Sequence, residues 1–180
     1  NFRMLSADEF GKLIFGVSNR HTPITAYQAL EDLGNTVGAI ADKNWNNTTN
    51  YSMSAHSEYA EYMRKNVGET TSLHFSLTMS DRDREFVQHI RPGGNYQDIP
   101  DSISTKRILN FKKTGARTTT YARLHPDQPS YTINTYFNRP NVGSNYHYKF
   151  LRLISPREAL RLQSFPDDFK FAGKKGSQYR

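Results

Sequence analysis

The stretch ISPREALRLQSFPDDFKFAG, residues 154–173, constrains the local fold of this 180-residue chain more tightly than any other segment. Ser155 suits the N-cap of a helix, because its hydroxyl can accept an unpaired N–H of the first turn. Pro156 follows at the first helical position, where its missing donor costs nothing, and Glu158 completes a capping box. Pro166 then ends the predicted helix, since the residue before a proline disfavours helical geometry. The apolar face of this helix consists of Ala159, Leu160, Leu162 and Phe165.

The first hundred residues predict mainly helices, because apolar side chains recur there at helical spacing. The predicted helices are ITAYQALEDLG (24–34), HSEYAEYMRKNV (56–67) and SDRDREFVQHI (80–90). Ser80 can cap the third helix, and the segment RPGGNYQDIP breaks it, because Gly93 and Gly94 are free to take positive φ. Residues 34–54 are rich in Asn, Thr and Gly and predict a long loop.

The pattern changes after Pro100, where apolar and polar side chains begin to alternate with the period of a strand. The predicted strands are TTTYARL (118–124), SYTINTYF (130–137) and KFLRLI (149–154). A polar loop, NRPNVGSNYHY, separates the last two of them. The predicted fold class is therefore α+β, a single irregular mixed domain. Its helices lie mainly in the first half, and short antiparallel strands and one capped helix lie in the second half.

Composition excludes several kinds of site. The sequence has no cysteine, which removes disulfides, thiolate metal ligands and a cysteine nucleophile. Its six histidines show no metal-binding spacing, so no metal site is predicted. No Gly-rich phosphate loop occurs, and Asp167 with Asp168 fits a turn better than a catalytic carboxylate pair. We therefore predict no catalytic, cofactor-binding or metal residue, and no membrane span, since no run of about 18 apolar residues exists.

The distribution of charge is uneven. Residues 1–100 hold 9 Lys and Arg against 12 Asp and Glu, whereas residues 101–180 hold 15 against 5. The two parts carry −3 and +10, which gives the net charge of +7. Residues 102–126 contain no acidic side chain at all. Such a basic segment is typical of proteins that bind polyanions, although a solvated basic face would give the same pattern.

Two segments concentrate the residue types that contact DNA. They are KKTGARTTTYAR (112–123) and NTYFNRPNVGSNY (134–146), both predicted to form loops between strands. Lys and Arg neutralise phosphates, Arg and Asn can pair with guanine and adenine edges, and Thr can meet a thymine methyl. Ordinary surface is the alternative for any one of these residues. The predicted contacts are Lys106, Arg107, Lys112, Lys113, Arg117, Thr118, Thr119, Thr120, Arg123, Asn138, Arg139 and Asn141.

The opening stretch closely resembles the ninth conserved block of cytosine-5 DNA methyltransferases. The block is filled by Arg152, Ile154, Ser155, Arg157, Glu158, Arg161, Leu162, Gln163, Phe165, Pro166 and Asp167. Upstream, YARLHPDQPSYTINT (121–135), RPGGNYQDIP (91–100) and ITAYQALEDLG (24–34) are similar to other segments of the same family. The similarity covers about residues 14–180.

The resemblance implies that recognition and catalysis lie in different domains, because the catalytic Pro-Cys loop and the S-adenosylmethionine blocks of the family are missing from this sequence. It implies that residues 1–180 form a target-recognition (small) domain without the catalytic domain. The full enzyme would attack cytosine with a cysteine thiolate and take the methyl group from S-adenosylmethionine. The ninth block would organise the recognition domain, through Arg152, Ser155, Arg157, Glu158, Arg161, Gln163, Pro166 and Asp167.

The expected function is DNA-sequence recognition within a DNA (cytosine-5-)methyltransferase of a restriction-modification system in the bacterial cytoplasm. The expected partners are double-stranded DNA and the missing catalytic domain or a complementing subunit, with no membrane partner. Because the chain lacks cysteine, we expect it to be inactive alone. The alternatives are a stand-alone DNA-binding module, a subunit of a split methyltransferase and a protein-docking role. Only the docking role predicts no salt-dependent binding to duplex DNA.

Overall fold

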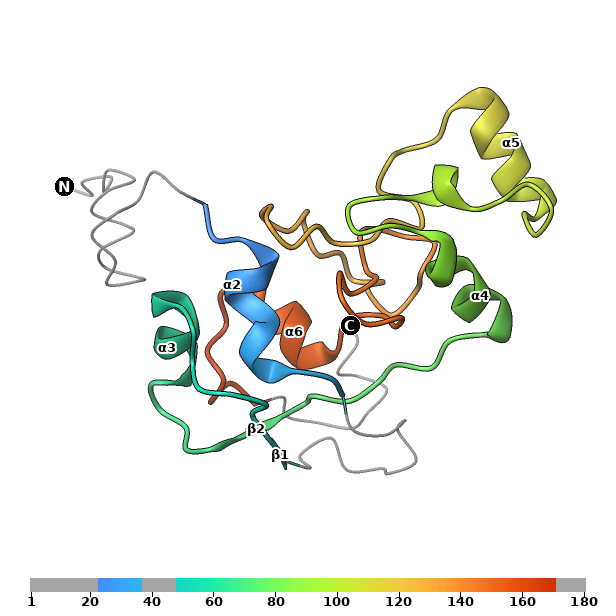
Figure 1. Cartoon of the computed structure of the whole chain (residues 1–180). Helices are drawn as coiled ribbons and strands as arrows, with labels where there is room; N and C mark the ends of the chain where they lie inside the picture. The colour runs from blue at the N-terminus through green and yellow to red at the C-terminus, as the bar shows by residue number, and fades with distance from the viewer. Residues whose placement is uncertain (1–22, 37–47, 171–180) are drawn as a thin grey trace.

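The computed structural model describes residues 23–36 and 48–170; the remaining parts of the recognised segments, among them residues 14–22 and 171–180, lie outside this range. Most of the described elements are short helices (Figure 1). In chain order they are α2 (Ala26–Leu30), η1 (Glu31–Leu33), β1 (Thr48–Asn50), α3 (Glu58–Arg64), β2 (Thr70–Ser72), α4 (Asp81–His89), η2 (Tyr96–Asp98), α5 (Lys106–Thr114) and α6 (Pro156–Arg161). These helices and the antiparallel pair β1–β2 confirm the α+β class.

Every α-helix among the described residues begins at a serine or threonine that caps its first turn. Ser80 accepts the N–H of Asp83 at 3.1 Å, and Ser155 accepts that of Glu158 at 3.1 Å, as predicted. The capping box of α6 is complete, since Glu158 also accepts the N–H of Ser155 at 2.7 Å. Side-chain oxygens thus satisfy donors that a helix start leaves unpaired, which explains why such short helices form.

The predicted positions of the strands are wrong. Residues 118–124, 130–137 and 149–154 contribute only isolated bridges, Arg123 with Tyr146 and Tyr146 with Leu153. The sheet lies instead in the first half, where Thr48–Asn50 pairs antiparallel with Thr70–Ser72. Alternation alone does not make a strand, because β-structure depends on which neighbours offer backbone partners. Here residues 122–124 bond to the backbone of Gly94 and Tyr146, and the N–H of Tyr136 bonds to the side chain of Asn134.

A helix that the sequence did not predict occupies the first part of the basic segment. α5 starts at a Thr105 cap, whose hydroxyl accepts the N–H of Ile108 at 3.2 Å. It ends at Gly115, which takes a φ of +78°. Ile108 is buried and anchors α5 to the core. Lys112 and the basic residues beside it therefore stand on a helix and not on the predicted loop.

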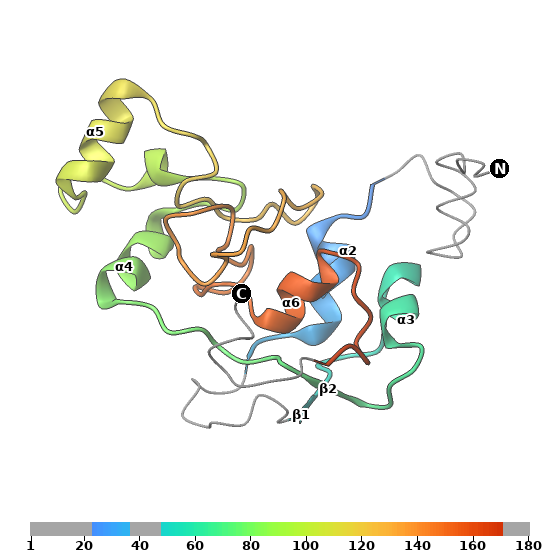
Figure 2. The same cartoon turned by 180° about the vertical axis from the view of Figure 1, so that it is seen from behind.

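Two large apolar clusters hold most of the described residues together, and Leu73 and Leu160 form a small third one. The first joins α2, α3 and α6 and consists of Ala26, Ala29, Leu30, Leu33, Tyr59, Met63, Leu124, Tyr148, Ile154 and Ala159. The second joins α4, η2 and α5 and consists of Leu77, Met79, Phe86, Val87, Ile90, Tyr96, Ile99, Ile108, Tyr146 and Leu153. The segment 122–154 contributes to both clusters, and it crosses between the two groups of helices in front and rear views (Figures 1 and 2).

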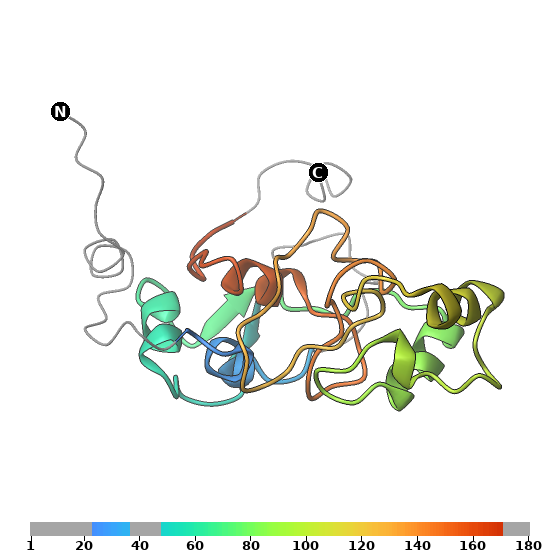
Figure 3. The same cartoon turned by 90° about the horizontal axis from the view of Figure 1, so that it is seen from above.

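The arrangement is elongated when seen from above, with α3 at one end and α4 and α5 at the other (Figure 3). α6 lies near the middle beside α2, so the capped helix is central rather than peripheral (Figures 1 and 3). Among residues 23–36 and 48–170, no helix is long and apolar enough to cross a membrane.

Candidate nucleic-acid interface

A buried network of ion pairs centred on α6 stabilises the fold that supports the candidate site. Arg161 is fully buried and lies between two carboxylates, with Nη1 2.5 Å from Asp32 and Nη2 2.6 Å from Asp167. It also donates to the carbonyl of Ala29 at 3.0 Å, and Tyr51 donates to Asp167 at 2.5 Å. Burial lowers the pKa of Arg161, but Asp167 and Asp32 outweigh it and raise that pKa above its ordinary value. Arg161 thus connects α2, α6 and the turn after α6.

A second buried arginine of α6 binds backbone carbonyls. Arg157 donates to the carbonyl of Ser72 at 3.0 Å, which fastens β2 to α6. It also donates to the carbonyls of Pro166 at 3.1 Å and Phe169 at 3.0 Å. The chain that leaves α6 is therefore folded back over the helix by one guanidinium.

Glu158 forms the third charged centre of α6. Both of its oxygens accept from Arg152, each at 2.8 Å, and one also accepts the capping N–H of Ser155. Burial alone would raise the pKa of Glu158, but Arg152 and the neighbouring His147 hold it well below its usual range. Among the predicted structural residues, Gln163 is exposed and Pro166 is half-buried. Those that are buried are Arg152, Ser155, Arg157, Glu158, Arg161 and Asp167.

Two buried histidines face Glu158. His147 Nδ1 accepts the N–H of Lys149 at 3.0 Å, so Nε2 carries the proton of the neutral ring and lies 3.5 Å from Glu158. Burial lowers the pKa of His147 to about 4. Burial also lowers the pKa of His74, whose Nδ1 lies 3.0 Å from the hydroxyl of Ser155. Both rings are therefore neutral in the folded chain near neutral pH.

This burial predicts loss of stability in mild acid. In the unfolded chain a histidine gains its proton near pH 6.5, whereas folded His147 resists protonation down to about pH 4. The stability is therefore complete above about pH 6.5 and falls as the pH drops toward 4, by up to about 1.4 kcal/mol per pH unit for each such histidine. Urea unfolding at several pH values measures this slope. His147→Asn, which can still accept the N–H of Lys149, should reduce it, and exposed His89→Gln should not. An unchanged slope in His147→Asn would contradict the assignment.

A glycine turn holds the chain just after residues 106–120, from here on called the basic segment, against the core. Gly93 donates its N–H to the carbonyl of Leu124 at 3.0 Å, and Gly94 accepts the N–H of Arg123 at 2.9 Å. Gly93 adopts a φ of +77°, as the sequence predicted for this turn. A Cβ on Gly94 would lie 1.8 Å from a carboxylate oxygen of Asp98 and 2.9 Å from the backbone carbonyl oxygen of Arg91, so a side chain there would force both to shift. The two glycines allow the backbone of this turn to lie close to that of Arg123 and Leu124. This contact fixes the position of the chain that follows the basic segment.

Arg123 is a correction to the predicted DNA contacts. Its side chain is buried, and its guanidinium donates to the carbonyls of His147 at 3.0 Å and Ile90 at 2.8 Å. Burial lowers its pKa. The guanidinium joins three chain segments inside the fold and cannot reach a phosphate without breaking these bonds.

Lys112 is a second correction. Its amino group contacts the carbonyl of Ile99 and lies 2.6 Å from the carboxylate of Asp101. The carboxylate of Asp101, which comes just before the acid-free residues 102–126, therefore neutralises the charge of Lys112. Lys112 fastens α5 to the preceding loop and does not belong among the free cations.

The remaining cations of the basic segment are exposed. Lys106, Arg107 and Lys113 stand on α5, and Arg117 follows the helix. Within the described part of the chain, these four have no ion pair with an acidic side chain. Of the predicted threonines, Thr118 is exposed, and the next two, Thr119 and Thr120, are half-buried.

The second predicted contact segment, here called the asparagine loop (residues 134–145), is shaped by two asparagine side chains. Asn134 accepts the N–H of Tyr136 at 2.8 Å and donates to the carbonyl of Val142 at 3.3 Å. Asn145 is 1% exposed and donates to the carbonyl of Arg139 at 3.0 Å. The sequence did not single out Asn145; the signal that could have found it is the enrichment of asparagine in turns, where its side chain bonds to nearby backbone.

The asparagine loop presents a cation and an aromatic ring to solvent. Tyr136 is 54% exposed, and the guanidinium of Arg139 lies over its ring, 4.8 Å from the centroid. Asn138 and Asn141 beside them are half-buried. Phe137 packs on the second cluster, as does Tyr121 after the basic segment, so both predicted contact segments flank the same core. Tyr136 was missed because an alternating pattern assigned it to a strand face.

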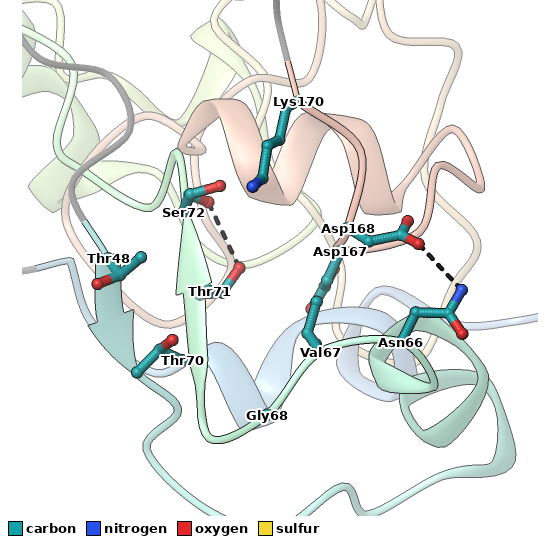
Figure 4. A pocket seen from close by; sticks show the side chains of 10 residues that line it. All are labelled: Thr48, Asn66, Val67, Gly68, Thr70, Thr71, Ser72, Asp167, Asp168 and Lys170. Atoms are coloured by element: carbon teal, nitrogen blue, oxygen red, sulfur yellow. Dashed lines mark hydrogen bonds between the residues drawn. The ribbon is translucent and has the colours of Figure 1, made fainter.

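A cavity of about 550 Å³ lies on the side of the molecule that holds α2, α3 and α6, between β1–β2 and the turn after α6 (Figure 4). It is lined by Thr48, Asn66, Val67, Gly68, Thr70, Thr71, Ser72, Asp167, Asp168 and Lys170. Asn66 donates to Asp168 at 2.9 Å across one wall. Among these described lining residues, Val67 supplies the only purely apolar side chain, and none supplies an aromatic face. No group of metal-ligating side chains occurs among residues 23–36 and 48–170.

The model of the C-5 cytosine-specific DNA methylase family matches residues 8–180. The type II methyltransferase M.BbvI of Brevibacillus brevis is 45% identical over 91 residues, which are 51% of this chain and 23% of that protein. M.NgoFVII of Neisseria gonorrhoeae is 37% identical over 110 residues, which are 60% of this chain and 27% of that protein. The chain thus spans about a quarter of the length of these relatives.

One solved structure also resembles the chain. It is described as a DNA modification methyltransferase encoded within a prophage of E. coli, and it superposes with a TM-score of 0.53. The superposition covers 93% of this chain and 44% of that chain, at 20% sequence identity. At this identity the likeness concerns the fold.

Proposed function

The chain belongs to the C-5 cytosine-specific DNA methylase family, and from this membership we propose that it forms the target-recognition domain of a DNA (cytosine-5-)methyltransferase. The observation that carries the proposal is a set of exposed cations that, within the described residues, form no ion pair with an acidic side chain: Lys106, Arg107, Lys113 and Arg117. A family whose substrate is DNA needs a surface that attracts phosphates and one that meets base edges. The basic segment and the asparagine loop supply these two chemistries on the same core.

Base reading is proposed for the asparagine loop. Arg139 can donate two parallel hydrogen bonds to a guanine edge, and Asn138 or Asn141 can pair with an adenine edge. The loop conformation is fixed by Asn134 and Asn145, so less conformational entropy is lost when DNA binds. Arg117 and the three threonines that follow it are proposed to meet the neighbouring phosphates and bases.

Methyl transfer itself is proposed to lie outside this chain. Enzymes of this family depend on S-adenosylmethionine, which supplies the methyl group when bound. The cavity beside β1–β2 does not suit that cofactor, because its described lining offers no aromatic or broad apolar face for an adenine ring. The sequence also has no cysteine to attack cytosine C6. The share of this chain is to bind the duplex and orient the target base, in the cytoplasm where the bacterial chromosome lies.

The base-reading assignment predicts a specific loss in two arginine variants. Arg139→Ala or Arg117→Ala should each lose about 1–3 kcal/mol of discrimination at one base pair, roughly 5- to 150-fold. The measurement compares binding to a preferred duplex and to its single-base variants, with exposed Lys65→Ala on the far side as the control. If both arginine variants keep the full preference, these residues are not the readers.

The absence of cysteine also favours a second candidate, a subunit that completes a partner carrying the catalytic thiolate. A methyl-transfer assay on duplex DNA separates the cases. We expect no transfer by this chain alone. Methyl transfer restored by a separate cysteine-bearing protein would support the split enzyme. Methyl transfer by this chain alone would contradict the proposal that catalysis lies outside it.

A further inference from the structure

α5 differs from the other helices in how little of it is buried. Ile108 is its only buried residue, while Lys106, Arg107 and Lys113 are exposed and Leu109 is 39% exposed. The helix stands at the end of the molecule, away from α2, α3 and α6 (Figures 1 and 3). A helix with so small an apolar contact needs other fastenings to stay in place.

The fastenings of α5 are polar and aromatic, and they all lie on its inner side. The hydroxyl of Tyr96 donates to the carbonyl of Ala116 at 3.2 Å and accepts the N–H of the same residue at 2.9 Å. The rings of Tyr96 and Phe111 meet edge to face at 5.8 Å. Lys112 adds its contacts with Ile99 and Asp101. α5 is therefore held rigidly with its outer cations turned to solvent.

The outer cations are of the kind that meet phosphates. Lys106 and Lys113 are flexible point charges with no bidentate geometry, which suits phosphate oxygens better than base edges. The guanidinium of Arg107 lies 5.1 Å from the centroid of the Phe111 ring, which supports it at the surface. Residues 102–126 contain no acidic side chain, and among the described residues no acidic side chain forms an ion pair with these three cations.

We infer that the outer face of α5, formed by Lys106, Arg107 and Lys113, grips the phosphate backbone of duplex DNA beside the bases that the asparagine loop reads. This inference rests on the proposed function and divides it into two parts. α5 supplies affinity without sequence preference, and the loop supplies preference. The partner is a nucleic-acid backbone because Arg117 follows α5 directly in the chain and because α5 and the asparagine loop pack on the same second cluster, through Phe111 and Phe137.

The test measures duplex binding by the whole chain from about 50 to 200 mM salt, together with the sequence selected from a random duplex pool. The variant Lys106→Ala/Arg107→Ala/Lys113→Ala should lower the slope of log K against log salt by about 2–3. It should weaken binding to all duplexes by a similar factor and select the same sequence as the wild type. Lys113→Ala alone should lower the slope by about 0.9, which provides a test with minimal risk to folding.

Lys112→Ala is the matched control, because it removes the same charge from the neighbouring position of the same helix. Its amino group already pairs with Asp101, so the salt slope should stay unchanged while the urea midpoint falls. An equal slope change in Lys112→Ala and Lys113→Ala would mean that net charge acts, and would overturn the inference. So would an unchanged slope in the triple variant, or a changed preferred sequence. If the wild type itself binds no duplex, the proposed function fails first, and this inference fails with it.

Discussion

Arg161→Ala is expected to destabilise the chain by about 3–5 kcal/mol, because the substitution removes the nearest cation of two buried carboxylates and leaves them only Arg64, 3.4 Å from Asp32, and Arg157, 3.9 Å from Asp167. Arg161 is fully buried between Asp32 and Asp167, and it bridges segments that are more than a hundred residues apart. A domain of this size has only about 5–15 kcal/mol of stability in total. The variant should therefore lose a large share of its stability and unfold at a markedly lower urea concentration and temperature. Urea or thermal unfolding followed by circular dichroism measures the loss.

Gln163→Ala is the matched control for Arg161→Ala, because Gln163 belongs to the same segment and is exposed. Its amide makes one weak contact, with the carbonyl of Ala159 at 3.3 Å, and its removal should cost less than about 0.5 kcal/mol. A double variant, Asp32→Asn/Asp167→Asn, also distinguishes the mechanism. If stranded carboxylates cause the loss, Arg161→Ala should cost much less in that background. A small cost of Arg161→Ala in the wild type would contradict the central role of this ion pair.

Glu158→Ala should also destabilise the chain by about 3–5 kcal/mol, because it leaves the buried cation Arg152 without its anion. It removes both acceptors of the Arg152 guanidinium and opens the capping box at Ser155. Since the carboxylate also faces His147, the change would leave Arg152 buried beside a histidine with no anion between them. Unfolding by urea at pH 7 measures the cost.

The controls for Glu158→Ala separate charge from capping. Exposed Glu85→Ala on α4 should change stability by less than about 0.5 kcal/mol. Glu158→Gln keeps an oxygen for the N–H of Ser155 but loses the charge, and should fall between the wild type and Glu158→Ala. If Glu158→Gln is as stable as the wild type, the charge of Glu158 does not matter to the fold and the proposed network is wrong.

The capped helix could be predicted from the sequence because its signals are local. Ser155, Pro156 and Glu158 lie within four positions of one another, and each has a geometric role that few other residue types fill. The family resemblance arose from the same residues, and the match over residues 8–180 confirms it. What these local signals did not reveal is that Arg157 and Arg161 are buried. Arginine is seldom buried without partners, and those partners, Ser72 and Asp32, lie far away in the sequence.

The candidate interface could be predicted only in part, because a basic segment does not state which of its charges are free. Arg123 and Lys112 have the same charge as Lys113, yet the carbonyls of Ile90 and Ile99 engage them within the fold. The strand positions were wrong for a related reason. Residues 130–137 alternate like a strand, but Asn134 accepts the backbone N–H of Tyr136, Asn145 donates to the carbonyl of Arg139 just beyond, and a turn forms instead.

The central claim is that this chain recognises DNA sequence for a cytosine-5 methyltransferase. Selection from a pool of random duplexes by the purified chain, followed by sequencing of the bound fraction, tests it most directly. We expect enrichment of one short sequence, with weaker enrichment at higher salt and with the preference at one base pair lost in Arg139→Ala. A bound fraction with the same sequence composition as the starting pool, or no bound fraction at low salt, would contradict it.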